Sequence, residues 1–277
     1  MKHHFPFVSH NLETKKREDL SFPFEDYGFL YGYGLFETIL VNKGLPVFLK
    51  EHVARLNYGA NIFEISFPFN LKTLETAVAD LIEKNQLSSG VLNIYLTPGQ
   101  RRYGSRRYDF SDPLLLMVNR VVTEDASEIV LAVREESFQR TRMDRFKTLA
   151  SMKNILEKRL SSQFDDILLY NHTEEILESP LANVFFVQEN RLVTPKSPLI
   201  LPGIVRQYLL DNQKDLSLPI TERVVYRDEL ESFDEIFLTN SLRGIIMVKK
   251  TDHYPHLKSG HIAHTIRDFY NRKLNLN

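Results

Sequence analysis

Four short motifs between residues 147 and 241 organise this chain of 277 residues. They are Lys147-Thr-Leu-Ala-Ser-Met-Lys-Asn-Ile-Leu156, Ile176-Leu-Glu-Ser-Pro-Leu-Ala-Asn-Val-Phe-Phe-Val187, Leu201-Pro-Gly-Ile-Val-Arg206 and Phe237-Leu-Thr-Asn-Ser241. The first opens an amphipathic segment with a lysine, and the second sets a carboxylate among apolar residues. The third turns through glycine into a helix, and the fourth ends a strand in polar side chains. No single motif is specific, but their order and spacing are.

The first two motifs each contribute one titratable group. An amine that forms a Schiff base must lie in a mostly buried pocket that lowers its pKa. Lys147 precedes a predicted core helix whose apolar residues are Met152, Ile155, Leu156 and Leu160. Glu178 lies in an apolar setting, where a carboxylate can pair with a protonated pyridine nitrogen. Taken alone, a lysine such as Lys147 would more often be a surface residue, and Glu178 would more often be a partly exposed strand-end residue.

The last two motifs are suited to an anion. The free N–H groups of Ile204 and Val205 at a helix N-terminus would point at a phosphate. Thr239, Asn240 and Ser241 could add side-chain donors. In isolation these are an ordinary helix entry and an ordinary strand end. An amine, a carboxylate and two phosphate-binding turns together are what a protein needs to hold pyridoxal phosphate.

Upstream, Gly28-Phe-Leu-Tyr-Gly-Tyr-Gly-Leu-Phe-Glu-Thr-Ile-Leu-Val41 has three glycines that indicate close backbone approach or positive φ. A strand follows this turn, whereas the dinucleotide-binding fingerprint requires a strand before it and a helix after it. His52 and Arg55 lie on one side of a predicted helix, where Arg55 alone is equally consistent with a surface salt bridge.

Four arginines lie in the loop Pro98-Gly-Gln-Arg-Arg-Tyr-Gly-Ser-Arg-Arg-Tyr108. Because guanidinium groups bind carboxylates bidentately, this loop could hold an acidic substrate. The alternative interpretation is a solvated basic loop.

Composition narrows the class of protein. The net charge of −1 gives no basic excess that would suggest a nucleic-acid partner. Cysteine is absent, which rules out disulfides and thiolate metal sites and fits a reducing compartment. The first residues have no long apolar core and no small-residue cleavage site, so no signal peptide is expected, and no apolar run approaches membrane-spanning length. We therefore expect a cytoplasmic protein with no membrane partner and no metal site.

Periodicity predicts two α+β domains with a cleft between them. Helices are expected at 50–63, 71–82, 151–162, 204–213 and 260–272. Strands are expected at 36–41, 45–49, 91–96, 113–120, 128–134, 165–171, 183–188, 217–226, 234–239 and 244–249. Residues 121–127 turn polar between two apolar runs and are the predicted linker. It would separate a small N-terminal α/β domain, 1–120, from a larger cofactor-binding domain, 128–277.

Taken together, the motifs resemble the fold-type IV pyridoxal-phosphate enzymes: branched-chain aminotransferases, D-amino-acid aminotransferases and 4-amino-4-deoxychorismate lyases. The resemblance runs from Phe24 to Val248 and also includes Glu51-His-Val-Ala-Arg-Leu56. It implies the α+β, two-domain fold of D-amino-acid aminotransferase, with a β-rich C-terminal domain and the cofactor in the interdomain cleft. It also implies a homodimer.

The resemblance assigns roles residue by residue. Lys147 matches the Schiff-base lysine, which also carries protons, and Glu178 matches the partner of the pyridine nitrogen. Arg55 matches the arginine that reaches the cofactor phosphate. The remaining phosphate contacts would come from Ile204, Val205 and Ser241.

Within the family, the lyases are most similar, through Phe22-Pro-Phe-Glu-Asp-Tyr-Gly-Phe-Leu-Tyr-Gly32 and Leu238-Thr-Asn-Ser-Leu242. The Gly-Asn-Tyr that follows the lysine in branched-chain aminotransferases is missing. Tyr33 stands where the family often has Asp, and Thr97-Pro-Gly99 stands where many members have Thr-Arg-Gly. Arg102, Arg106 or Arg107 could replace the missing arginine as the contact for the substrate carboxylate. The predicted substrate contacts are Arg102, Arg107 and Phe36.

Three hypotheses follow for the function. The first is a lyase that converts 4-amino-4-deoxychorismate to 4-aminobenzoate and pyruvate in folate biosynthesis. The second is an aminotransferase acting on D- or branched-chain amino acids. The third is a non-catalytic binding protein on the same scaffold.

Overall fold

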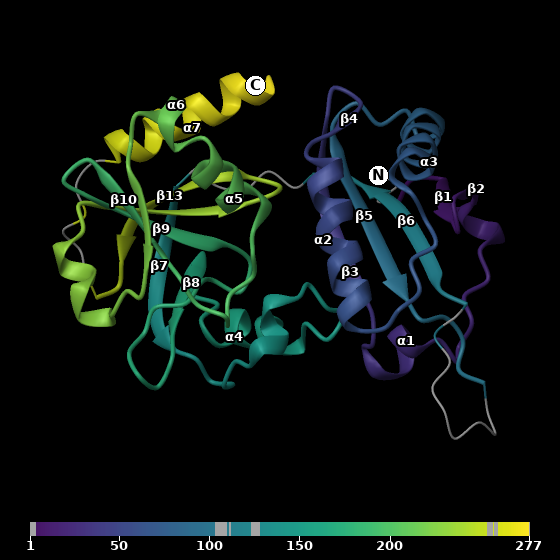
Figure 1. Ribbon diagram of the computed structural model, residues 1–277, viewed down its shortest axis with the longest axis horizontal. Helices are drawn as coiled ribbons and strands as arrows, with labels where there is room; N and C mark the ends of the chain where they lie inside the picture. The colour runs from purple at the N-terminus through teal and green to yellow at the C-terminus, as the bar shows by residue number, and fades with distance from the viewer. Residues whose placement is uncertain are drawn as a thin grey trace. The chain divides into compact units, whose positions relative to one another are not determined.

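The computed structural model describes residues 4–102, 110, 112–122, 128–253, 257 and 260–276. The chain divides into two compact units (Figure 1), the first of Met1–Glu124 with Phe146–Ala150 and the second of Asp125–Arg145 with Ser151–Asn277. The short segment Phe146–Ala150, which carries Lys147, thus groups with the N-terminal residues. Most of the predicted linker, 123–127, lies outside the described residues, so the domain limits stay a prediction.

The first unit contains one antiparallel sheet of six strands in the order β2-β1-β6-β5-β3-β4, with two long helices packed on it. Its elements are β1 (Phe7–His10), β2 (Glu13–Lys16), η1 (Arg17–Asp19), α1 (Tyr27–Tyr31), β3 (Leu35–Asn42), β4 (Leu45–Pro46), α2 (Leu49–Ile62), α3 (Leu71–Lys84), β5 (Gly90–Thr97) and β6 (Leu114–Arg120). The strand expected at 45–49 ends at Pro46, because α2 already begins at Leu49.

Alternation and helical spacing explain how this unit forms its core. Every second residue of β3 is buried, beginning with Leu35. The buried residues of α3 recur at helical spacing: Leu74, Ala77, Val78, Leu81 and Ile82. Asn70 caps α3 by accepting a hydrogen bond from the N–H of Thr73 at 2.9 Å. These faces meet in one apolar cluster between the helices and the sheet.

The second unit contains a mixed sheet of seven strands in the order β11-β10-β9-β12-β13-β7-β8. Its elements are β7 (Glu128–Glu135), η2 (Arg142–Arg145), α4 (Met152–Leu160), β8 (Asp166–Tyr170), β9 (Asn183–Gln188), β10 (Arg191–Pro195), α5 (Ile204–Asp211), α6 (Gln213–Leu216), β11 (Ile220–Arg223), η3 (Arg227–Ser232), β12 (Glu235–Asn240), β13 (Gly244–Thr251) and α7 (His261–Leu274). The neighbours β10/β11, β13/β7 and β7/β8 are parallel, and the others are antiparallel. Together the two units confirm the predicted α+β class.

The sequence predicted a helix after Lys147 that packs its apolar residues into the core, and this packing is wrong. Helix α4 forms, but Met152, Ile155 and Leu160 are more than half exposed. The buried residue of α4 is Glu157, whose carboxylate accepts hydrogen bonds from the backbone N–H of Ser137 at 2.6 Å and from its hydroxyl at 3.0 Å. The buried contact of α4 is therefore polar, while three of its apolar side chains are exposed.

Candidate active site

The glycine-rich stretch before β3 positions the lysine segment. A Cβ on Gly28 would lie 2.5 Å from Thr97 Cγ2, and a Cβ on Gly34 would lie 2.7 Å from Leu149 Cδ1. Only glycine therefore leaves room for residues 147–149 beside the start of β3. There, the N–H of Phe36 donates to the carbonyl of Lys147 at 2.9 Å, and the N–H of Leu149 donates to that of Gly34 at 2.9 Å. The predicted close backbone approach is confirmed, and its effect is to place Lys147 on the edge of β3.

The amine of Lys147 lies over an aromatic ring. Its Nζ is 4.2 Å from the centroid of Phe36, a cation–π distance, and the Phe36 ring stacks on Tyr95 at 6.2 Å. The side chain of Lys147 is half-buried. Phe36, predicted as a substrate contact, is thus a direct neighbour of the amine.

Arg55 is paired with a buried carboxylate that the sequence analysis did not identify as a site residue. Its Nε donates to Glu37 Oε1 at 2.8 Å, and its Nη2 donates to Glu37 Oε2 at 2.6 Å. His52 Nδ1 lies 2.6 Å from the same Oε2. Burial would raise the pKa of Glu37, but Arg55 and His52 outweigh it and hold the pKa at about 2. The carboxylate is therefore ionised, which makes His52 Nδ1 the hydrogen-bond donor.

Burial, more than any neighbouring charge, disfavours the protonation of His52. Burial lowers the pKa of His52 most; Glu37 opposes this shift, and the cations of Arg55 and Lys147 add to it. Its Nε2 is buried and has no hydrogen-bond partner within the described part of the chain. Lys147 and Arg55 of the first unit thus both lie close enough to His52 for their positive charges to lower its pKa.

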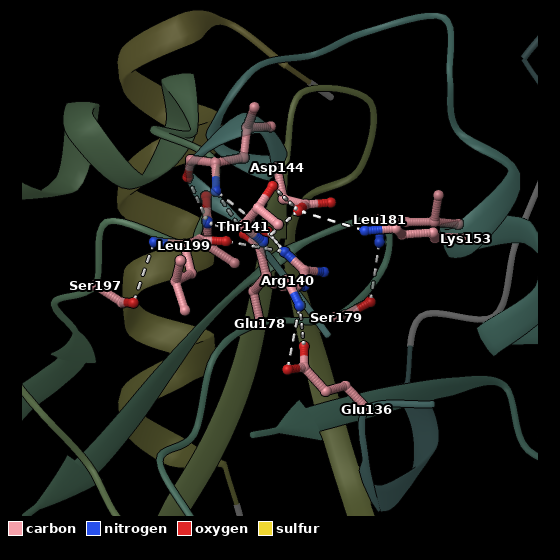
Figure 2. A network of polar contacts seen from close by, with 12 residues as sticks. Glu136, Arg140, Thr141, Asp144, Lys153, Glu178, Ser179, Leu181, Ser197 and Leu199 are labelled. Atoms are coloured by element: carbon pink, nitrogen blue, oxygen red, sulfur yellow. Dashed lines mark hydrogen bonds and ion pairs between the residues drawn. The ribbon is translucent and has the colours of Figure 1, made fainter. Parts of the chain in front are cut away.

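Glu178 is fully enclosed in the second unit and fixed from several sides. Figure 2 shows Arg140 beside it, with the guanidinium of Arg140 ion-paired to Glu178 Oε1. The amide of Asn183 donates to Oε2 at 2.8 Å, and the N–H of Leu201 donates to both oxygens at 3.2 Å. Burial raises the pKa of Glu178, while Arg140 is the largest influence that opposes the rise. Glu178 is therefore buried as predicted, but its neighbours include several hydrogen-bond donors. These donors favour the ionised carboxylate and fix its orientation.

The helix N-terminus predicted from Leu201-Pro-Gly-Ile-Val-Arg206 is present. Helix α5 begins at Ile204, and its N-cap Gly203 supplies no side-chain hydrogen bond. A Cβ on Gly203 would lie 1.9 Å from Asn183 Oδ1. This close approach requires glycine and brings the start of α5 against the residue that holds Glu178. The N–H groups of Ile204 and Val205 belong to the first turn of α5, where they can donate hydrogen bonds to a phosphate.

The strand end at β12 supplies hydroxyl groups. Thr239 pairs in register with Asn183 on the neighbouring strand β9. Its Oγ1 is buried and lacks a hydrogen-bond partner within the described residues. Ser241 is partly exposed just after β12. A buried hydroxyl without a partner and a helix start without a cap are consistent with a bound phosphate, so the residues of each unit fit pyridoxal phosphate.

The predicted substrate arginines are placed only in part. Arg102 is exposed, and Arg106 and Arg107 lie outside the described residues. The guanidinium of Arg101 donates to the hydroxyl of Tyr31 and lies 5.7 Å from the centroid of that ring. Asp26 accepts a hydrogen bond from Thr97 Oγ1 at 2.5 Å, which anchors the start of this loop.

Sequence reasoning missed Glu37, Arg140 and Asn183. Glu37 carried a usable signal, because it is a charged residue at a core-facing position of the alternating strand β3. Arg140 carried none, since it stands among several charged residues of a polar stretch.

No metal-binding cluster of three or more His, Asp or Glu side chains occurs among the described residues. In the same part of the chain, no helix has both the length and the apolar character needed to cross a membrane.

Comparison with known proteins adds to this geometry. Residues 34–251 match the family model described as amino-transferase class IV. The D-alanine aminotransferase of Bacillus licheniformis is 27% identical over 255 residues, which is 88% of this chain and 88% of that protein. The aminodeoxychorismate lyase of Bacillus subtilis is 26% identical over 265 residues, 90% of this chain and 88% of that protein.

A solved structure extends the likeness to the fold. The putative 4-amino-4-deoxychorismate lyase of Legionella pneumophila superposes with a TM-score of 0.83 at 26% identity. The match covers 92% of this chain and 96% of that chain, so it includes the elements of both units.

Proposed function

Because the chain belongs to the class IV aminotransferase family, and so is an enzyme that depends on pyridoxal phosphate, we propose that it is a 4-amino-4-deoxychorismate lyase. The reaction would release 4-aminobenzoate and pyruvate. Membership of an enzyme family removes the basis for the hypothesis of a non-catalytic binding protein. The observation that carries the lyase is the likeness to the putative 4-amino-4-deoxychorismate lyase of Legionella pneumophila, which is nearly complete along both chains.

When bound, pyridoxal phosphate supplies a cationic ring that withdraws electrons from the carbon beside the substrate nitrogen. Lys147 would hold the cofactor through its amine and, once released, remove the proton from that carbon. Glu178 would hold the proton on the ring nitrogen, since the contacts from Asn183 and Leu201 fix its carboxylate. Arg102 or Arg107 would bind a carboxylate of the substrate.

The phosphate of the cofactor would be held by four groups. Arg55 would contribute its charge, Ile204 and Val205 their backbone N–H groups, and Ser241 its hydroxyl. A dianion at the start of α5 is favoured by the helix dipole as well as by these donors.

The lyase is tested with purified protein, pyridoxal phosphate and 4-amino-4-deoxychorismate. We expect pyruvate and 4-aminobenzoate in equal amounts. If neither product forms while amino acids are transaminated, the lyase proposal is wrong.

The second candidate is an aminotransferase acting on D- or branched-chain amino acids. The full-length similarity to D-alanine aminotransferase favours the D-amino-acid form. An aminotransferase would use the same Lys147 to return the proton to the cofactor, so the two reactions share one site. D-alanine would then bleach the visible absorption band of the loaded enzyme and yield pyruvate only in stoichiometric amount until an acceptor oxoacid is added.

Lys147→Ala tests the lysine itself. We expect the loaded wild-type protein to have an absorption band near the visible edge and the variant to lack it, because the band requires the covalent link to the amine. Lys153→Ala is a matched control, since Lys153 binds the carbonyl of Gln139 at 3.2 Å and has no proposed role. A band that persists in Lys147→Ala and that borohydride reduction fixes covalently to the protein would assign the link to another lysine.

We also propose that the enzyme is a homodimer, as the family resemblance implies, and that α4 contributes to the interface. Met152, Ile155 and Leu160 are exposed apolar residues on this one helix. Ile155→Glu should shift the protein from dimer to monomer in sedimentation, whereas Lys214→Glu, on the exposed surface of α6, should not. A monomeric wild type would refute the dimer. The cytoplasmic location stays a prediction.

A further inference from the structure

The guanidinium of Arg55 is held along one edge. Glu37 engages Nε and Nη2 at 2.8 and 2.6 Å, one carboxylate oxygen for each nitrogen. This is the bidentate geometry that fixes both the plane and the direction of an arginine. The pair does not use Nη1, which is therefore the nitrogen oriented away from Glu37.

Glu37 occupies a position that would ordinarily be apolar. It lies between Leu35 and Ile39 on the buried face of β3, and its side chain is 1% exposed. A buried ion pair is often no more stabilising than apolar residues of similar volume. The carboxylate therefore contributes something other than core packing, and its contacts indicate what: its strong donors are Arg55 and His52.

His52 in turn fixes the carboxylate. It lies one helical turn before Arg55 on α2, and its Nδ1 is 2.6 Å from the Oε2 that also receives Arg55 Nη2. Its Nε2 has no partner among the residues that the structure describes, so Glu37 is the hydrogen-bond partner of its ring there. A carboxylate bound at both oxygens, with a third donor on one of them, has a single orientation.

We propose that Glu37 and His52 are positioning residues that hold Arg55 in the orientation needed to bind the cofactor phosphate. This inference rests on the proposed contact between Arg55 and that phosphate. Glu37 and His52 do not touch the cofactor; they act through the guanidinium. Arg55 is thereby pre-ordered, and its rotamer entropy is lost on folding instead of on binding.

The affinity for pyridoxal phosphate relative to pyridoxal isolates this effect. The two ligands differ only in the phosphate. The dissociation constant of pyridoxal divided by that of pyridoxal phosphate therefore reports the phosphate contacts, and general damage to the site cancels in this ratio. The ratio is measured by equilibrium titration of the apoenzyme for the wild type, Glu37→Gln, Arg55→Ala and the double variant. Glu51→Gln, an exposed residue of α2, is the control.

We expect Glu37→Gln to reduce the ratio about tenfold, the lower end of what losing a supporting group behind a metal ligand costs. In the Arg55→Ala background, Glu37→Gln should change the ratio no further, because its effect passes through Arg55. A loss of equal size for both ligands would overturn the proposal and make Glu37 merely structural, as would an unchanged ratio in Glu37→Gln when Arg55→Ala lowers it.

Two other outcomes of the same titration would contradict the proposed function and not the positioning role of Glu37. A wild type that binds neither ligand contradicts the cofactor, and an Arg55→Ala variant with the wild-type ratio contradicts the contact between Arg55 and the phosphate.

His52 provides a second test that does not depend on the folding of Glu37→Gln. His52→Asn places an amide N–H where Nδ1 donates, whereas His52→Leu removes the donor. We expect Leu to lower the ratio and Asn to restore most of it. Equal ratios in the two variants and the wild type would remove His52 from the proposal.

Discussion

Acid should destabilise the first unit through one identifiable carboxylate, Glu37. Its pKa is about 2 in the folded protein, below the ordinary value of 4.5, because Arg55 and His52 outweigh the effect of burial. A lowered pKa stabilises the fold at pH values above the unfolded pKa, and this contribution is lost as the pH falls toward the folded pKa. The difference between 4.5 and about 2, at about 1.4 kcal/mol per unit, corresponds to about 3 kcal/mol.

Urea unfolding at a series of pH values measures this contribution. The chain has 12 tyrosines and no tryptophan, so tyrosine fluorescence and circular dichroism are suitable probes. At neutral pH, Glu37→Gln should be less stable by about 3–5 kcal/mol, because it leaves the charge of Arg55 buried without its counterion. As the pH falls from 4.5 toward 2, the gap between wild type and variant should narrow by about 3 kcal/mol.

Glu51→Gln is the matched control, since it removes an exposed carboxylate from α2. It should follow the wild-type curve throughout. A gap between wild type and Glu37→Gln that stays constant over the acid range would refute the reasoning, because Glu37 would then bind protons equally in the folded and unfolded states.

Two further predictions concern the second unit. Gly203→Ala should weaken binding of pyridoxal phosphate and lower stability by about 1–3 kcal/mol, since its Cβ would lie 1.9 Å from Asn183 Oδ1. Gly260→Ala at the start of α7, where the nearest atom would be 3.8 Å away, should change neither quantity, and equal effects of the two variants in titration and thermal melts would contradict this account. Arg140→Met should cost about 3–5 kcal/mol in denaturant unfolding by leaving the Glu178 carboxylate without its counterion. Adding Glu178→Gln should recover part of that loss, and no recovery would show that Arg140 acts through other contacts.

Local features were predictable from the sequence because they depend on neighbours along the chain. The glycines at 28 and 34 indicated close backbone approach, and the structure shows that they make room for the lysine segment. Pro202 and Gly203 indicated a turn into a helix, and α5 begins at Ile204. A strand was expected at 36–41, and β3 spans Leu35–Asn42. In each case the local conformation is set by the backbone and by side chains that are adjacent in the sequence.

What the sequence alone determined was therefore the set of chemical groups and the local conformations that carry them: an amine at Lys147, a carboxylate at Glu178 and a helix start at Ile204. The tertiary structure decided which groups pair. Glu178 pairs with Arg140, 38 positions away in the sequence, and Glu37 pairs with Arg55, 18 positions away. The tertiary structure also decided that the buried residue of α4 is Glu157 and not one of its apolar residues. Periodicity reports which side of an element is apolar, but an ion pair forms only where the topology of the sheets brings two distant charges together and excludes water from both.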